Sequence, residues 1–503
     1  MTYNGVIAAG HRDGGFCRPR FSLGLLPVML AMSTSTGREV LFEAQPNRHG
    51  GRLVGRLISS LLACAAIGMI GIGPSSRAAD PGKTRPTSKN KIELPGPSDA
   101  PAVSVPRPQP RKPADFKSTH FLVHTDLPSK EAHELLSRLE TMLGLISKYW
   151  GFPPVGIIEC YVVKDLHVWP AGSLHPAGQA KIAEEAGVTL SESLTQGNKT
   201  VATKAVVYAF ADRGTPQHEA VHAYCAQTFG KTGPLWYSEG MAEMGQYWYR
   251  NDAGVHCHPF VVQYIRSNRP KPLSAILSEQ SITGDSWQNY AWRWALCHLM
   301  ENNTNYKPRF RPLGLGYLTG QRVSFAETFG PMAAEIAFEY RFFLKHLDEG
   351  YRVDLCSWDW KHKFKEPAGG VAICSRTVAN RGWQASGALV SPDKKYDYSA
   401  SGRWQLAKTA EPAAADGDAQ GAGRLEGVIF NDFQLSEPFA LGAYGSFAPP
   451  AEGQLFLRCR DKWNELADNK GLMSVKIKVS GDGQPLSRPS HTAEEPTETA
   501  AAQ

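Results

Sequence analysis

His218-Glu219-Ala220-Val221-His222 lies in a helical pattern that begins near Pro216. Two histidines four residues apart project from one face of a helix, close enough to share a zinc ion at about 2.0–2.1 Å from each nitrogen. Glu219, between them, points toward the same ion and can take a proton from an attacking water. The motif therefore predicts a zinc centre with His218 and His222 as ligands and Glu219 as the general base.

A second helical segment begins at Trp236, after a loop that contains Gly and Pro. A catalytic zinc needs three protein ligands and an open position for water, so the first motif is one ligand short. Glu239 supplies the third ligand from an antiparallel neighbouring helix. Glu243 lies one turn later on the same face, where it can accept the outer N–H of a ligating imidazole and hold its orientation.

HEAVH followed by WYSEGMAE resembles the gluzincin clan of zinc metallopeptidases, which includes thermolysin and the membrane alanyl aminopeptidases. In that clan the Glu of the second helix is the third zinc ligand, which maps onto Glu239. Sixteen residues separate His222 from Glu239, slightly fewer than in the better-known members, and a shorter loop would explain the difference. The resemblance covers roughly residues 116–350 and is specific in 206–300. It implies an α+β, thermolysin-like catalytic domain built from a small sheet and a bundle of helices.

Two further positions follow from the same resemblance. Tyr290 opens the segment YAWRWALCHL, which is similar to the aminopeptidase helix whose leading tyrosine donates a hydrogen bond to the tetrahedral oxyanion. Residues 206–210 resemble the edge strand that pairs with an extended substrate. The aminopeptidases' Gly-x-Met-Glu-Asn motif is absent, which favours an endopeptidase over amino-terminal trimming.

These residues together predict zinc-dependent hydrolysis of peptide bonds in an extracellular or periplasmic protein. Zinc would lower the pKa of water toward about 7, Glu219 would remove its proton and pass it to the leaving amine, and Tyr290 would help zinc to stabilise the oxyanion. The alternative of another class is a non-enzymatic, calcium-dependent glycan- or surface-binding protein with an inactive protease-like domain. Decayed proteases commonly lose the Glu base or a His, and here neither is missing. A zinc hydrolase of non-peptide amides stays open.

Composition divides the rest of the chain. Residues 80–115 are rich in Pro, Lys and Ser, and predict an extended linker between an N-terminal extension (1–79) and the catalytic domain (116–350). After that domain, short alternating segments separated by Gly, Pro and Asp predict an all-β sandwich at 370–481. The last residues, 482–503, read as a disordered tail.

The sandwich holds a second cluster of oxygen-bearing side chains. Asp461, Glu465, Asp468 and Asn469 lie in one turn between two predicted strands, and oxygen ligands suit a hard cation such as Ca²⁺. Their spacing resembles that of small calcium-dependent galactose-binding bacterial lectins, over roughly residues 383–480. The departure is Glu465, where a smaller side chain is usual, and no sugar-contacting residue can be matched. The resemblance implies calcium and carbohydrate binding; the other interpretation is a solvated turn that links two strands.

The N-terminal extension predicts export. Arg52 and Arg56 precede an apolar segment, 57–74, and a small-residue run, which is the form of a signal peptide at about 52–79. We therefore expect a secreted or periplasmic protein with no stable membrane insertion after cleavage; the alternative is an anchor formed by the same segment. Beyond residue 79 the chain's 54 basic and 48 acidic residues fall to 46 and 45, because the extension holds eight Arg and three acidic residues. This balance gives no electrostatic reason to expect nucleic acid or an anionic membrane surface as a partner. A peptide or protein substrate is what the resemblance to the gluzincins implies.

Seven of the nine cysteines lie beyond residue 79, without C-x-x-C spacing, which excludes a zinc ribbon. In an oxidising compartment we expect one or two disulfides, and Cys356–Cys374 is the nearest pair in the sequence. The odd count leaves at least one thiol free, and other pairings stay open.

Overall fold

A five-stranded sheet, in the order β1-β2-β3-β5-β4, begins the fold of the computed structural model, which describes residues 112–196, 199–249, 252–278 and 287–489. Its strands are β1 (Ala114–Lys117), β2 (Phe121–Thr125), β3 (Ile158–Val163), β4 (Gly187–Gln196) and β5 (Lys199–Phe210). β2, β3 and β5 run parallel, while β1 and β4 pair antiparallel at the two ends. Burial alternates along β2, as expected for a strand with one face on the core.

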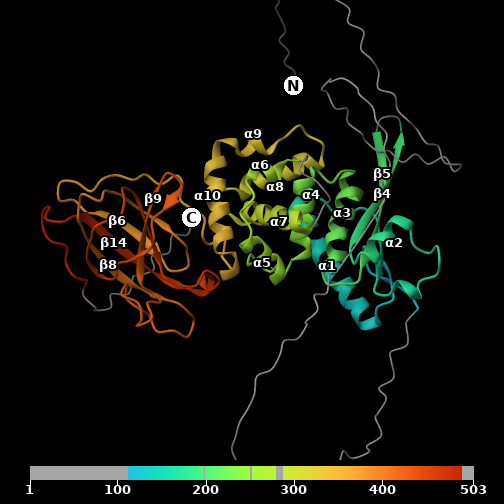
Figure 1. Cartoon of the computed structure of the whole chain (residues 1–503), viewed down its shortest axis with the longest axis horizontal. Coiled ribbons are helices and arrows are strands. Elements are labelled where there is room, and N and C mark those ends of the chain that lie inside the picture. Colours follow the sequence, from blue (N-terminus) through green and yellow to red (C-terminus); the bar gives the residue numbers. More distant parts are fainter. Residues whose placement is uncertain (1–111, 197–198, 250–251, 279–286, 490–503) are drawn as a thin grey trace, which may run out of the picture. The chain divides into compact units, whose positions relative to one another are not determined.

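β4 forms the end of the sheet next to β5, so the prediction that 206–210 is an edge strand is wrong. The edge strand is β4, and the sequence carries no clear strand signal at these residues. Its side chains from Gly187 to Leu194 are half or fully exposed, so β4 lacks the apolar run that marks a buried strand. Figure 1 shows β4 and β5 side by side as a long hairpin next to α2 and α3.

The middle of the chain is helical (Figure 1). The helices are α1 (Ser129–Trp150), α2 (Pro176–Ala183), α3 (Thr215–Phe229), α4 (Leu235–Gln246), α5 (Pro259–Ser267), α6 (Leu273–Leu277), α7 (Trp287–Asn302), α8 (Lys307–Leu318), α9 (Phe325–Phe329) and α10 (Ala333–Lys345). α1 buries Leu135, Leu139 and Leu143, which lie four residues apart and so share one face of the helix. α7 is buried on every side from Ala291 to Met300, which makes it the central helix of this region.

The carboxy-terminal region consists of strands in two sheets, of order β12-β8-β14-β6 and β10-β9-β13-β7, with β11 beside β9. The strands are β6 (Ile373–Val378), β7 (Gln384–Val390), β8 (Tyr396–Gln405), β9 (Leu425–Asn431), β10 (Gln434–Leu435), β11 (Phe439–Ala440), β12 (Tyr444–Phe447), β13 (Gly453–Cys459) and β14 (Lys470–Val479). Val475 and Ile477 are buried while Lys476 is exposed, as the alternation in the sequence predicts. The protein is thus a mixed α+β fold with a β-rich carboxy-terminal region.

The residues just after β14 pack onto its outer face. Lys478 Nζ donates hydrogen bonds to the carbonyl oxygens of Asp482 and Gln484, and Ser399 Oγ donates to the carbonyl of Ser487 at 3.0 Å. Residues 482–487, which the sequence assigns to a disordered tail, are therefore held against the sheet, and residues 490–503 of the expected tail lie outside the described residues.

One hydrophobic core includes residues of both the helical and the β-rich regions. The ring centroids of Trp358 and Phe456 lie 4.5 Å apart, and those of Phe342 on α10 and Trp463 lie 5.8 Å apart. The described residues belong to one compact unit, and the predicted parts at 116–350 and 370–481 share part of their core.

The predicted N-terminal extension (1–79), with its signal segment at 52–79, lies outside the described residues, as does most of the linker at 80–115. β1 already begins at Ala114, inside the predicted linker. In the part of the chain that the structure describes, no helix is long and apolar enough to cross a membrane.

The seven cysteines beyond residue 79 are free, so the predicted disulfides, Cys356–Cys374 included, are wrong. Cys356 is buried in the core, whereas Cys374 is exposed on β6. The two thiols are close in sequence but lie in different environments. Burial raises the pKa of the Cys356 thiol to about 12, which makes it a poor nucleophile.

Candidate metal centre

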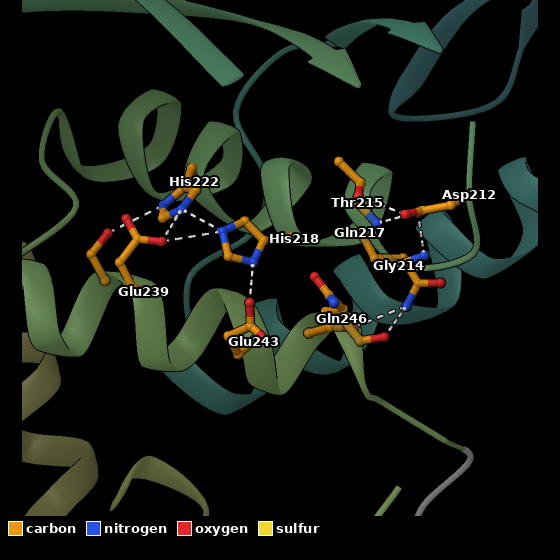
Figure 2. A network of polar contacts seen from close by, with 11 residues as sticks. Asp212, Gly214, Thr215, Gln217, His218, His222, Glu239, Glu243 and Gln246 are labelled. Carbon is orange, nitrogen blue, oxygen red and sulfur yellow. Dashed lines mark hydrogen bonds and ion pairs between the residues drawn. The ribbon is translucent and has the colours of Figure 1, made fainter. Parts of the chain in front are cut away.

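Helix α3 carries the HEAVH residues, and Asp212 fixes its start. Asp212 Oδ1 accepts hydrogen bonds from the backbone N–H groups of Gly214 at 2.8 Å and Thr215 at 2.6 Å, and Oδ2 accepts from Thr215 Oγ1 at 2.9 Å (Figure 2). These N–H groups have no partner inside the helix. Pro216 follows in the first turn, where a missing N–H costs nothing. The start of α3 is therefore set one turn before His218.

Close packing holds α4 against α3 and α7. The buried Gln217 of α3 donates from Nε2 to the carbonyl of Gly245 at 2.9 Å. A Cβ atom on Gly245 would lie 2.5 Å from Cγ2 of Val221, and one on Gly240 would overlap the sulfur of Cys297 on α7. Only glycine permits this approach, which brings the side chains of α3 and α4 together.

The three predicted zinc ligands meet between α3 and α4 (Figure 2). His218 Nε2 lies 3.2 Å from Glu239 Oε2 and 3.2 Å from His222 Nε2, and His222 Nε2 lies 3.5 Å from Glu239 Oε2. The side chains are only 8%, 14% and 11% exposed for His218, His222 and Glu239. Within the described ranges, no other group of three or more His, Cys, Asp or Glu side chains comes within reach of one ion.

These separations fit a tetrahedral zinc site. With zinc–ligand distances of about 2.0–2.1 Å and tetrahedral angles, two ligand atoms lie roughly 3.3–3.4 Å apart. The three observed separations, 3.2, 3.2 and 3.5 Å, bracket that value. Three protein ligands leave the fourth position of the tetrahedron for solvent or substrate, as in catalytic zinc sites. The donor set and its spacing could therefore hold a metal ion of tetrahedral preference, such as Zn²⁺.

The outer nitrogen of each imidazole faces a polar side chain of α4. His218 Nδ1 lies 3.2 Å from Glu243 Oε1, and His222 Nδ1 lies 3.2 Å from Ser238 Oγ. Such partners fix the ring orientation and leave Nε2 of each ring free to bind a metal. Glu243 lies where the sequence predicts it, beside the outer nitrogen of His218. Ser238 has the same position relative to His222 and was not predicted.

Two buried carboxylates determine the electrostatics of the site. Burial alone would raise the pKa of the Glu239 carboxyl, but the imidazoles of His222 and His218 hold it well below its usual range. Burial alone would lower the pKa of His218, but hydrogen bonding to Glu239 and Glu243 raises it well above its ordinary value. The raised pKa of His218 indicates a negative potential at its ring, which favours a cation there. The lowered pKa of Glu239 shows that its carboxylate keeps its negative charge beside the imidazoles.

Glu219 lies on α3 beside the edge strand β4. Thr189 Oγ1 of β4 is 2.8 Å from Glu219 Oε2 and 2.9 Å from the Glu219 carbonyl oxygen. A hydroxyl has one hydrogen to donate, and donation to the carboxylate would orient the group that the sequence predicts as the general base. Glu219 is 7% exposed, and its negative charge contributes to the raised pKa of His218.

Tyr290 lies in the first turn of α7, beside His218, the first predicted zinc ligand. The ring centroids of Tyr290 and His218 are 5.7 Å apart, and the guanidinium carbon of the buried Arg293 is 5.7 Å from the Tyr290 ring. Tyr290, the predicted oxyanion donor, thus lies next to one of the three predicted ligands and comes from a third helix.

The predicted calcium ligands do not come together in the same way. Asp461 Oδ2 accepts a hydrogen bond from Asn469 Nδ2 at 2.8 Å, and Glu465 Oε1 accepts from Lys462 Nζ at 2.8 Å. Asp468 is exposed. Asp461, Glu465 and Asp468 do not form a three-carboxylate group within the reach of one ion in the part of the chain that is described.

Sequence reasoning missed four residues that support the centre: Asp212, Gln217, Thr189 and Ser238. Asp212 carries a recognisable signal, because an Asp shortly before Thr-Pro is a common way to begin a helix. Gln217, Thr189 and Ser238 have no local signal, since their partners lie on other elements.

Comparisons with known proteins add little to this geometry. No family model matches the chain, and no curated protein matches it. Among solved structures, the chain is similar to one described as "EclA N-terminal domain; PllA-like lectin", with 19% identity and a TM-score of 0.20. The match covers 22% of this chain and 100% of that chain.

Proposed function

We propose that this chain is a zinc-dependent endopeptidase of the thermolysin-like, gluzincin type. The observation that carries the proposal is the triangle formed by Nε2 of His218, Nε2 of His222 and Oε2 of Glu239, with edges of 3.2, 3.2 and 3.5 Å. Two further observations support the proposal: Glu219, the candidate base, lies on α3 between His218 and His222, and the Tyr290 ring of α7 lies 5.7 Å from the His218 ring.

Zinc, when bound, supplies a Lewis acid that polarises a carbonyl and makes water acidic near neutral pH. Glu219 accepts the proton of the attacking water and passes it to the leaving amine, with its carboxylate oriented by Thr189. Tyr290 donates a hydrogen bond to the oxygen that becomes negative in the tetrahedral state. Glu243 and Ser238 keep the two imidazoles in their ligating orientation.

The edge strand β4 supports a peptide as the substrate. β4 pairs with β5 on one side, and Thr189 joins it directly to the proposed base. A free strand edge can bind an extended peptide through main-chain hydrogen bonds. Such pairing would hold a scissile bond beside the ligand triangle without a requirement for one particular side chain, as an endopeptidase needs.

The test compares purified wild-type protein with Glu219→Gln. We expect one zinc per chain by metal analysis in both proteins, and cleavage of casein or a peptide library by the wild type only. Loss of a general base lowers the rate by about 10²–10⁴-fold. Equal cleavage by both proteins would overturn the mechanism, and absence of zinc from the wild type after reconstitution would overturn the metal centre.

A further inference from the structure

A groove lies in the carboxy-terminal region, and none of its lining residues belongs to the candidate metal centre. It has a volume of about 950 Å³ and is formed by β6, β7, β14, the connecting segment around 357–362 and the loop at 304–305. Binding sites for small ligands occupy roughly 300–1,000 Å³, so this volume can hold a short oligomer. We call it the basic groove.

The exposed lining of the basic groove is cationic. Arg376, Arg381 and Lys476 are exposed side chains of the lining, and Asp359 is its one acidic residue. Three cations and one carboxylate give a formal charge of +2 with His362 neutral. Asp359 Oδ2 lies 3.4 Å from Nδ1 of His362, whereas none of the three basic residues has an ion-pair partner in the described ranges. The groove therefore presents uncompensated positive charge.

The register of the sheet sets the spacing of two of these charges. β6 and β14 pair antiparallel with Arg376 opposite Ser474 and Cys374 opposite Lys476. Arg376 and Lys476 are therefore diagonal neighbours on the outward face, roughly 7–8 Å apart at the backbone. This spacing suits a ligand with repeated anionic groups better than a single small anion. Arginine also binds carboxylate and sulfate in a bidentate manner.

The remaining lining distinguishes between polyanions. Trp358, Trp383 and Val475 are only 2%, 4% and 0% exposed, so the groove offers neither an apolar anchor for a peptide nor a stacking surface for nucleobases. Main-chain pairing between β6 and β14 occupies the backbone groups at the floor. The other exposed side chains include the hydroxyls of Thr304 and Ser474, which suit sugar hydroxyl groups.

We propose that the basic groove binds an acidic oligosaccharide, whose carboxylate or sulfate groups contact Arg376, Arg381 and Lys476. The site is independent of the zinc centre, and the two proposals can fail separately. Binding to an acidic glycan would keep the protein on an anionic polysaccharide matrix.

Calorimetry with the full chain tests this proposal. The probes are oligogalacturonate with its neutral methyl ester, and dextran sulfate oligomers with unmodified dextran. We expect binding of one or both charged probes and of neither neutral partner; the charged probe that binds identifies the anionic group. The double variant Arg376→Ala/Lys476→Ala should weaken binding at least tenfold, since each lost contact is a hydrogen bond to a charged group. Lys470→Ala, an exposed cation of β14 outside the groove, should bind as the wild type does.

Unchanged melting temperatures of the variants would show that they fold. Equal affinity of the double variant and the wild type would overturn the proposal, as would tighter binding of poly-glutamate or single-stranded DNA than of either charged glycan. Glu219→Gln should bind the glycan with unchanged affinity, because the groove uses no residue of the metal centre.

Discussion

The sequence predicts two metal sites, and the side chains of the two clusters are arranged differently in the structure. At the predicted zinc centre, the side chains of His218, His222 and Glu239 converge from two packed helices, with their candidate ligand atoms 3.2–3.5 Å apart and nearly buried. At the turn between β13 and β14, Asp461 and Glu465 are satisfied by Asn469 and Lys462. Helical spacing fixes the direction of each side chain, whereas a surface turn lets each carboxylate bind its nearest donor.

Burial explains why this difference matters. A buried carboxylate that keeps its charge needs a cation, so Glu239 and Glu243, the two buried carboxylates beside His218, favour a positive charge there. An exposed carboxylate is already stabilised by water and has less to gain. The zinc centre should therefore respond strongly to the loss of any one part, and the turn weakly.

The largest effect is expected from His218→Ala. Removal of one of three protein ligands should abolish stoichiometric zinc and lower peptide hydrolysis by at least about 10³-fold, since a catalytic zinc site needs three protein ligands. Metal analysis after dialysis, together with a peptide assay, measures both. His133→Ala, an exposed histidine of α1, is the matched control and should retain zinc and activity. Full activity of His218→Ala would show that the ligand triangle is not the catalytic site.

Glu243→Ala should have the next largest effect. The variant leaves Nδ1 of His218 without its carboxylate, at an observed distance of 3.2 Å. Loss of such a partner weakens metal binding by about 10–100-fold. Competition with a chelator of known zinc affinity measures the change, and Glu243→Gln should recover part of it. If Glu243→Ala binds zinc with wild-type affinity, Glu243 does not orient His218 for metal binding.

Ser238→Ala should weaken zinc binding less than Glu243→Ala does. The Ser238 hydroxyl meets Nδ1 of His222 at the same distance of 3.2 Å, but it carries no charge. Charge-assisted hydrogen bonds are roughly twice as strong as neutral ones, so we expect about half the change in free energy. The same chelator competition ranks the two variants, and the reverse order would contradict the electrostatic account.

Much of the zinc centre follows from local patterns in the sequence. His218 and His222 share a helix, and helical spacing places Glu239 and Glu243 on one face of α4, so each expectation needs only the geometry of one element and its neighbour. Ser238 and Thr189 required the three-dimensional structure, because their partners lie on other elements. The edge strand was misassigned for a related reason: β4 has half-exposed side chains and no clear apolar run.

The features that the sequence did not predict depend on contacts between residues that are far apart in the sequence or on separation of residues that are near in it. Arg376 and Lys476 are one hundred residues apart, and only the register of β6 with β14 makes them neighbours in the basic groove. The expected Cys356–Cys374 disulfide failed because closeness in sequence does not bring the two thiols together in space. In both cases the outcome depended on sheet topology, which composition and spacing do not contain.

The smallest effect is expected when calcium is added. If the turn held Ca²⁺ with a dissociation constant a hundredfold below the added concentration, linkage would stabilise the protein by about 2.7 kcal/mol. That stabilisation would raise the melting temperature by several degrees. We expect no shift, because Asp461 and Glu465 already have partners and no three-carboxylate group forms among the described residues of the turn. Thermal melts in millimolar Ca²⁺ and in EGTA measure this. A shift of several degrees that Asp461→Asn removes would mean that an ion can draw these side chains together after all.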